Sequence, residues 1–136
     1  SWKFIYKCLQ YFNFNQTCID WIQLFYNEIK SAVCVNAKVS EWFEITRGCR
    51  QGDPLSPYIF IICAEVLSIL IRQNNSIKGY LVNEKQICIS QYADDTAFFL
   101  DGSRESFEYT VFTILEYAKF AGLNMNFEKT NSNLVW

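Results

Sequence analysis

The chain has 136 residues, of which 51% are hydrophobic and 18% aromatic, so it is long and apolar enough to fold as one domain rather than remain disordered. Twelve basic and fourteen acidic side chains give a net charge of −2, without the basic excess that is typical of nucleic-acid binders. Because the chain has no histidine, nucleophilic catalysis with a histidine base is excluded within it.

The cysteines indicate free thiols rather than a metal site. None of them forms a CxxC pair, and without histidine a zinc site is not expected. Several fall on apolar faces, which favours buried thiols in a reducing, intracellular compartment, the cytoplasm or the nucleus. Their even number leaves disulfides as the alternative. The cysteines are Cys8, Cys18, Cys34, Cys49, Cys63 and Cys88.

Two features concern the ends of the chain and the membrane. The most apolar stretch, residues 58–71, is too short to span a bilayer and carries Glu65, so no membrane span is expected. The first residues, SWKF, have neither a signal-peptide pattern nor an initiating methionine. We therefore expect a piece of a longer protein.

Helical spacing of apolar residues predicts two helices at the start, which residues 13–15 separate. The first covers residues 2–12, and two strands, residues 32–37 and 42–46, follow the second helix around a polar turn at residues 38–41. The expected apolar faces are Trp2, Ile5, Tyr6, Leu9 and Phe12 in the first helix and Ile19, Ile22, Phe25, Tyr26 and Ile29 in the second.

A loop rich in turn formers and charge, residues 47–57, precedes a third helix. This helix starts after either Asp53 or Ser56. Ser56 is favoured as the cap because Pro57 then takes the first helical position, where its missing N–H costs nothing. Both polar residues are expected to serve the helix start and not catalysis. The helix should run to about Arg72, and being apolar nearly all round it should be buried.

The second half of the chain predicts strands and one more helix. Strands are expected at residues 77–82 and 87–91 around a turn at 83–86, and then at residues 96–100 and 134–136. Ser103 can cap the helix and Gly122 suits its end. The helix's expected apolar face comprises Phe107, Val111, Ile114, Leu115 and Ala118. The order of elements predicts an α+β domain whose mainly antiparallel sheet packs on helices.

Asp94 and Asp95 lie side by side between two strand-like runs. Neighbouring side chains of a regular strand point to opposite faces, so both carboxylates can approach one site only at a turn. Adjacent carboxylates repel each other, and a bound cation relieves that repulsion. The pair is therefore either a metal site or an ordinary polar hairpin turn, since aspartate is common in turns.

Three separated segments carry a resemblance that covers essentially the whole chain. They are residues 47–57, which read RGCRQGDPLSP, residues 92–95, which read YADD, and residues 121–126, which read AGLNMN and are followed by EKT at 128–130. Together they resemble the fingers–palm region of reverse transcriptases, most closely those of non-LTR (LINE-type) retrotransposons. Residues 1–136 would then be a partial reverse transcriptase domain, a palm with adjoining fingers elements.

The resemblance implies RNA-directed DNA synthesis, with an RNA template, a DNA primer and deoxynucleoside triphosphates as partners. It makes Asp94 and Asp95 ligands of Mg²⁺, with Mn²⁺ as the alternative ion, because carboxylates suit these cations. Ala93 would leave room near the primer end. Tyr92 would line the primer or template path, and its alternative role is that of a packed aromatic side chain.

The loop before the third helix would face the incoming nucleotide. Gly52 would let the backbone approach closely, and Gln51 would hydrogen-bond the nucleotide or the template edge. Arg47 and Arg50 would contact phosphate or template. The alternative is a solvated loop with a capped helix.

Lys129 matches the lysine that protonates the leaving pyrophosphate in this family, although an exposed lysine near a strand is the alternative. The family takes a further metal-binding aspartate from a strand that would precede Ser1. The thumb is also missing, and we expect the isolated chain to be inactive. Two other functions remain open: a non-catalytic remnant that binds nucleic acid or a protein partner, and another palm-type polymerase, which the RQGDPLSP run makes less favoured.

Overall fold

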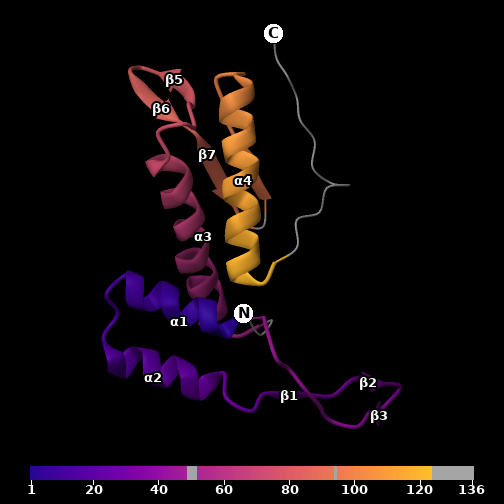
Figure 1. Cartoon of the computed structure of the whole chain (residues 1–136). Helices are drawn as coiled ribbons and strands as arrows, with labels where there is room; N and C mark the ends of the chain where they lie inside the picture. Colours follow the sequence, from indigo (N-terminus) through magenta and orange to yellow (C-terminus); the bar gives the residue numbers. More distant parts are fainter. Residues whose placement is uncertain (49–51, 94, 124–136) are drawn as a thin grey trace. The chain divides into compact units, whose positions relative to one another are not determined.

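The structure is a computed structural model that describes residues 1–48, 52–93 and 95–123 (Figure 1). The chain divides into two compact units, Ser1–Cys63 and Ala64–Trp136, with the division inside one long helix. The strands named below pair as antiparallel two-stranded sheets, which confirms the α+β class. The first unit contains α1 (Trp2–Tyr11), α2 (Gln16–Phe25), β1 (Lys30–Ser31), β2 (Cys34–Val35), β3 (Lys38–Val39), β4 (Phe43–Glu44) and the start of α3 (Ser56–Gln73). The second contains the rest of α3, β5 (Tyr80–Val82), β6 (Lys85–Ile87), β7 (Ile89–Tyr92), β8 (Asp95–Phe98) and α4 (Arg104–Ala121).

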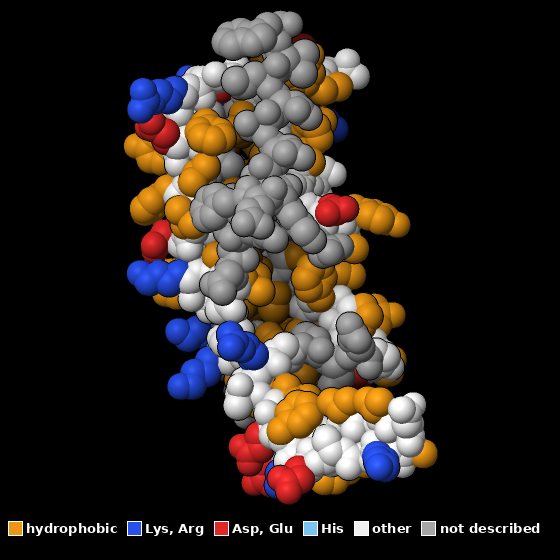
Figure 2. Space-filling model, turned by 90° about the vertical axis from the view of Figure 1, so that its right-hand side faces the viewer, with side chains coloured by type: hydrophobic (Ala, Val, Ile, Leu, Met, Phe, Trp, Pro, Cys, Tyr) orange, Lys and Arg blue, Asp and Glu red, His pale blue; other side chains and the backbone are white. Residues whose placement is uncertain are grey.

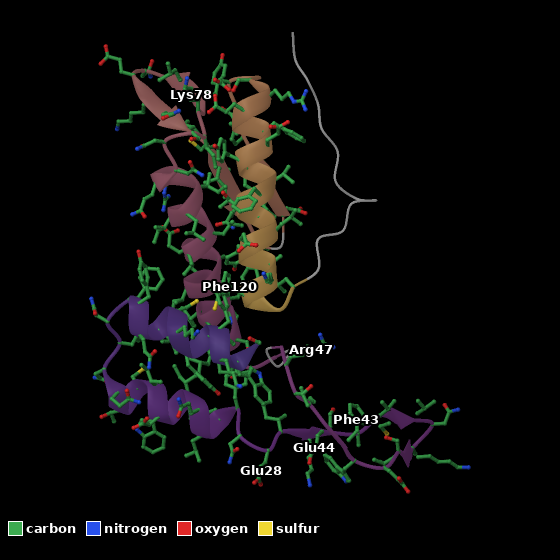
Figure 3. All side chains as sticks on the ribbon, viewed as in Figure 1. Glu28, Phe43, Glu44, Arg47, Lys78 and Phe120 are labelled. Atoms are coloured by element: carbon green, nitrogen blue, oxygen red, sulfur yellow. The ribbon has the colours of Figure 1, made fainter. Side chains whose placement is uncertain are left out.

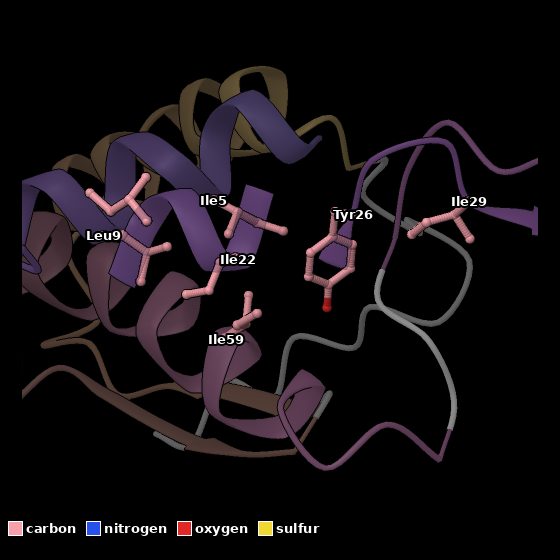
Figure 4. Packing of buried hydrophobic residues seen from close by; sticks show 7 residues of the cluster. Ile5, Leu9, Ile22, Tyr26, Ile29 and Ile59 are labelled. Atoms are coloured by element: carbon pink, nitrogen blue, oxygen red, sulfur yellow. The ribbon is translucent and has the colours of Figure 1, made fainter. Parts of the chain in front are cut away.

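The core of the first unit is built by α1, α2 and the start of α3. Figure 4 shows the buried side chains of this core, and each fully buried aliphatic side chain is worth about 1.5–3 kcal/mol. Trp2 and Tyr6 pack against it from α1, as their spacing predicted. The core consists of Ile5, Leu9, Ile19, Ile22, Tyr26, Ile29 and Ile59.

The second helix differs from its expected extent and face. The Asn15 side chain accepts a hydrogen bond from the backbone N–H of Cys18 (2.7 Å) and starts α2, which ends at Phe25. Tyr26 and Ile29 lie beyond the last residue of the helix, and both are nevertheless buried in the core. Phe25 was assigned to the buried face and is 57% exposed, so that assignment is wrong. Its ring lies next to that of Trp21 on the exposed side of α2, with the centroids 6.4 Å apart and the planes inclined by 33°.

The expected strand pair of the first unit forms, but with its turn displaced. The turn consists of Asn36 and Ala37, not residues 38–41, and β2 pairs with β3 directly across it. Further from the turn, β1 pairs with β4. The φ angles of Asn36 and Ala37 are +49° and +61°, as a two-residue hairpin turn requires. The missed signal is the residue type, because alanine stands where such turns favour glycine.

Replacing Ala37 by Gly should stabilise the β2–β3 hairpin by about 1 kcal/mol, because a Cβ is unfavourable in the left-handed region. Amide hydrogen exchange of β2 and β3 should slow by several-fold, and the thermal midpoint should not fall. Ala32, which lies outside the turn, supplies the control: Ala32→Gly should give no gain. Faster exchange in Ala37→Gly would contradict the turn geometry.

In the second unit the expected strands are confirmed in place but divided differently. The run expected as one strand at residues 87–91 splits at the buried residue Cys88. Its first part belongs to β6, which pairs with β5 across a turn at Asn83 and Glu84. Its second part is β7, which pairs with β8. The strand expected at residues 134–136 lies outside the described residues.

The ends of α4 agree with the sequence, whereas its buried face agrees only in part: Ala118 is buried as expected, and Val111 and Ile114 are half-buried. Ser103 accepts a hydrogen bond from the N–H of Ser106, and Gly122 ends the helix with a φ of +73°. Phe107 and Leu115 were expected to be buried and are 52% and 43% exposed. Two hydroxyl residues, Ser106 and Thr110, share the buried face, and their polar atoms have partners: Ser106 accepts a hydrogen bond from the N–H of Lys78 at 3.0 Å, and Thr110 donates to the carbonyl of Ser106 at 2.7 Å. The buried residues of α4 are Ser106, Thr110, Tyr117, Ala118 and Ala121.

Asp101 supports the start of α4 and makes it sensitive to acid. The hydroxyl and the backbone N–H of Ser103 both donate to its carboxylate, at 2.7 and 3.0 Å. These hydrogen bonds hold the pKa of Asp101 below its ordinary value of 3.8, and the bond from the Ser103 hydroxyl has the larger effect. A lowered folded-state pKa means that the stabilisation is present above the unfolded pKa and is lost as the pH falls through the folded one.

Asp101→Asn should therefore lower the urea midpoint at pH 7, whereas the difference from the unchanged protein should shrink as the pH falls through the lowered pKa of the carboxyl. The measurement is a set of urea midpoints between neutral and acidic pH. In a Ser103→Ala background the same substitution should have a smaller effect, because the main hydrogen-bond donor is gone. An equal effect at every pH would refute this role of the carboxylate.

The third helix was expected to be buried all round, and in the structure it is not. Tyr58 and Ile61 are 67% and 62% exposed, and Figure 2 shows many hydrophobic side chains at the surface. Its 18 residues are long and apolar enough to cross a membrane by length and composition, a test that core helices of soluble proteins also pass. Glu65 and Arg72 form an ion pair on this helix.

The cysteines within the described residues are free thiols, as expected, and Cys49 lies outside that part. A side-chain hydrogen bond with Cys63 lowers the pKa of the Cys8 thiol, while burial raises the pKa of the Cys88 thiol.

Candidate functional site

The YADD segment forms the tip of the β7–β8 hairpin. Tyr92 pairs with Asp95, so residues 93 and 94 alone connect the two strands. Directly opposite residues of an antiparallel pair share a face, which places the Tyr92 and Asp95 side chains on the same face of the hairpin. Ala93 has a φ of +49°, as a two-residue turn requires. Asp94 lies outside the described residues.

The tip is open to solvent. Tyr92 is 84% exposed, which excludes its alternative role as a packed aromatic side chain within the described part. Asp95 and Ala93 are also exposed. A carboxylate oxygen at an open hairpin end is a suitable ligand for Mg²⁺ or Mn²⁺, which bind carboxylates and keep several water ligands. Among the described residues there is no group of three or more potential metal-binding side chains.

A part-buried hydrogen bond links the hairpin to α3. The hydroxyl of Ser68 donates a hydrogen bond to Oε1 of Gln91 at 2.6 Å. Gln91 is the residue directly before Tyr92 in the chain. Ser68 is 5% exposed, so water hardly competes for this bond. No sequence pattern predicted a role for Ser68, because a single serine on an apolar helix does not indicate a hydrogen-bond partner. Gln91 was visible only as the residue before the YADD segment.

The base of the hairpin depends on a close backbone approach at Gly79. Gly79 forms a β-bridge with Leu100, and the N–H of Phe99 donates to the carbonyl of Cys88 at 2.9 Å. A Cβ at Gly79 would lie 2.6 Å from Sγ of Cys88 and even closer to the carbonyl oxygen of Ile87. Only glycine therefore fits this position without a shift of the neighbouring strand.

Gly79→Ala should destabilise the second unit by about 1–3 kcal/mol, the range found for overpacked sites, and disturb the β7–β8 hairpin. Hydrogen exchange and the urea midpoint would measure both effects. Gly102→Ala is the control, because a Cβ there meets no atom within 4 Å although its φ is +82°. It should cost stability near the start of α4 and leave exchange in the hairpin unchanged. Equal hairpin exchange in both variants would disprove the clash.

The loop before α3 is anchored at both of its described flanks. On one side, Nε1–H of Trp2 donates to the carbonyl of Gly48 at 2.9 Å. On the other, Asp53 accepts hydrogen bonds from the N–H of Leu55 (3.1 Å) and the hydroxyl of Ser56 (2.9 Å).

These hydrogen bonds correct the expected cap. Ser56 is the first residue of α3 and not the residue before it, and the Asp53 side chain caps the preceding turn. A carboxylate next to a helix N-terminus also interacts favourably with the helix dipole. The expectation that both residues serve the helix start is confirmed.

Other expected site residues fall on or near this loop. Arg47 is exposed (Figure 3), as is Gly52, whose φ is +81° and whose α-carbon has open space beside it. That geometry agrees with the expected role of Gly52, because glycine adopts a positive φ easily and has no side chain to keep a ligand away from the backbone. Arg50, Gln51 and Lys129 lie outside the described residues.

The expected site residues that the structure describes fall in two groups, one in each unit. Tyr92, Ala93 and Asp95 share one hairpin of the second unit, and Arg47 and Gly52 share one loop of the first unit. Each group is described within its own unit.

Comparison with known proteins decides the family. Residues 1–133 match the family described as reverse transcriptase (RNA-dependent DNA polymerase). The chain belongs to the reverse transcriptase family. The resemblance that its three segments carried is confirmed over nearly the whole chain.

Relatives of this reverse transcriptase chain include retrotransposon proteins. It is 28% identical over 125 residues to the retrovirus-related Pol polyprotein of a type-2 retrotransposable element of Drosophila melanogaster, covering 92% of the chain and 11% of the polyprotein. It is 30% identical over 88 residues to the corresponding polyprotein of a type-1 element of Popillia japonica, covering 65% of the chain and 12% of the polyprotein.

A shorter relative is an uncharacterised mitochondrial protein of Arabidopsis thaliana, 47% identical over 57 residues, which covers 38% of the chain and 47% of that protein. The reverse transcriptase chain therefore spans about half of this relative and about a tenth of the polyproteins.

Proposed function

We propose that this chain supplies part of the nucleotidyl-transfer site of an RNA-directed DNA polymerase of a mobile element. The observation that carries the proposal is the YADD tip, held open on a two-residue hairpin in a chain of this family. A polar turn without function would not need a tyrosine that is 84% exposed beside the carboxylates.

In the proposed site Asp94 and Asp95 hold divalent cations, Mg²⁺ or Mn²⁺. When bound, such ions lower the energy of charge on the attacking and leaving oxygens of phosphoryl transfer. The two carboxylates would hold the ions at the end of a short hairpin. Because the hairpin is short, it limits the movement of the two carboxylates. Tyr92 and Ala93 border the path of the primer and the RNA template.

The loop before α3 is the proposed binding segment for the deoxynucleoside triphosphate. Arg47 and Arg50 supply positive charge to phosphates in a chain whose net charge is −2. Gln51 hydrogen-bonds the nucleotide or the template edge, and the exposed backbone at Gly52 allows close approach. Lys129 delivers the proton to the leaving pyrophosphate.

Because the resemblance implies a further metal-binding aspartate outside these residues, the chain alone should not extend a primer. Joined to a strand that supplies this aspartate, it should extend a DNA primer on an RNA template with Mg²⁺ or Mn²⁺. Asp94→Asn or Asp95→Asn should then reduce extension about 100-fold or more, since several kcal/mol of charge stabilisation are lost.

The matched control is Glu84→Gln, which removes an acidic side chain from the two-residue turn of the neighbouring β5–β6 hairpin. It should leave extension unchanged. A completed chain that folds but extends no primer would favour the non-catalytic remnant. Equal extension on DNA and RNA templates would favour another palm-type polymerase.

A further inference from the structure

We propose that Cys8 and Cys63 form a redox-reversible modification site, where a low-molecular-weight disulfide oxidises the two thiols to an intramolecular disulfide. Cys8 lies on α1 and Cys63 on α3, and both belong to the first unit. Neither residue is part of the YADD tip or of the loop before α3. Their oxidation therefore does not depend on the proposed function.

The core of the first unit brings the two thiols together. Ile5, which precedes Cys8 by one turn of α1, and Ile59 of α3 belong to the same buried cluster (Figure 4). Cys63 follows Ile59 by one turn, so it lies on the same face of α3, and it packs against this cluster. The side chains of Cys8 and Cys63 share a hydrogen bond, and both are thiols in the structure. The two sulfurs are therefore neighbours, although their residues are far apart in the sequence.

The two thiols differ in the ways that a two-step oxidation requires. Cys63 is half-buried, so a small oxidant can reach its sulfur, whereas Cys8 is only 3% exposed. The hydrogen bond with Cys63 lowers the pKa of the Cys8 thiol more than burial raises it. A hydrogen bond lowers a pKa by stabilising the charged form, so Cys63 donates to the Cys8 thiolate. The thiolate is the form that attacks a disulfide.

Oxidation then takes place in two exchange steps. In the first, the sulfur of Cys63 attacks one sulfur of the small disulfide, and the departing half leaves as a thiol with the proton of Cys63. In the second, the Cys8 thiolate attacks Sγ of Cys63, and the other half leaves as a thiol with the proton of Cys8. The two cysteines lose two electrons and two protons, and the small disulfide gains both as it becomes two thiols.

Cys88, in the second unit, is the contrasting case. It is 6% exposed and so nearly as buried as Cys8, but burial raises the pKa of its thiol. A buried thiol with a raised pKa is unreactive at neutral pH. Burial alone therefore does not prepare a cysteine of this chain for oxidation, and the neighbouring thiol makes the difference at Cys8.

The test treats the full 136-residue chain with a mixture of glutathione and glutathione disulfide and maps the joined peptides by mass spectrometry without reduction. Cys8 and Cys63 should be joined in the main product, and dithiothreitol should restore both thiols. The urea midpoint of the oxidised chain should rise, and amide exchange of α1 should slow by about tenfold or more, because the bond closes a long loop in the unfolded chain.

Cys18→Ser is the matched control, because Cys18 is another partly buried thiol that packs against the same core. This variant should still form the joined product, with the same rise in the urea midpoint. Cys8→Ser and Cys63→Ser should each abolish both effects. Cys63→Ser changes only a half-buried position, so it decides the matter even where Cys8→Ser fails to fold.

A chain that gains only a glutathione adduct, or a disulfide between other cysteines, would overturn the proposal. A joined product that persists in Cys63→Ser would do the same. A lower urea midpoint after oxidation would also contradict it, because the bond would then not fit the contact between α1 and α3.

Discussion

The hydrogen-bond chain from Tyr26 through Ser56 to Asp53 determines where α3 begins. Tyr26 and Ser56 are buried, and the half-buried carboxylate of Asp53 also accepts a hydrogen bond from the N–H of Leu55. Ile59, in the first turn of α3, belongs to the core of the first unit.

The buried position of Ser68 matters for the candidate site, since its hydroxyl holds Gln91 and with it strand β7. The hairpin is further constrained at its base, where Gly79 leaves no room for a side chain. Between these restraints, Tyr92 and Asp95 stand exposed on one face of a two-residue turn. In the proposed function, an exposed but supported tip suits side chains that would bind ions and a primer without first becoming ordered.

The sequence located most elements because their signals are local. Residues 2–11 and 104–121 show helical periodicity, and Ser103 and Gly122 mark the ends of α4 by residue type. The sequence prediction was wrong where a residue occupies a backbone conformation that its type rarely adopts. Ala37 occupies a left-handed turn position that normally indicates glycine, so the hairpin turn was placed too late in the chain. Phe25 was assigned to the core on spacing alone, which carries no information on where the helix ends.

The sequence by itself determined the family, the α+β class and the identity of the YADD and RGCRQGDPLSP segments, because these depend on residue types in short runs. Only the tertiary structure decided which polar residues are buried and which apolar ones are not. Ser106 is fully buried because the Lys78 N–H reaches it from another segment, and Trp2 reaches Gly48 for the same kind of reason. Such partners lie far apart along the chain, and a hydrogen bond between them depends on distances that exist only after folding.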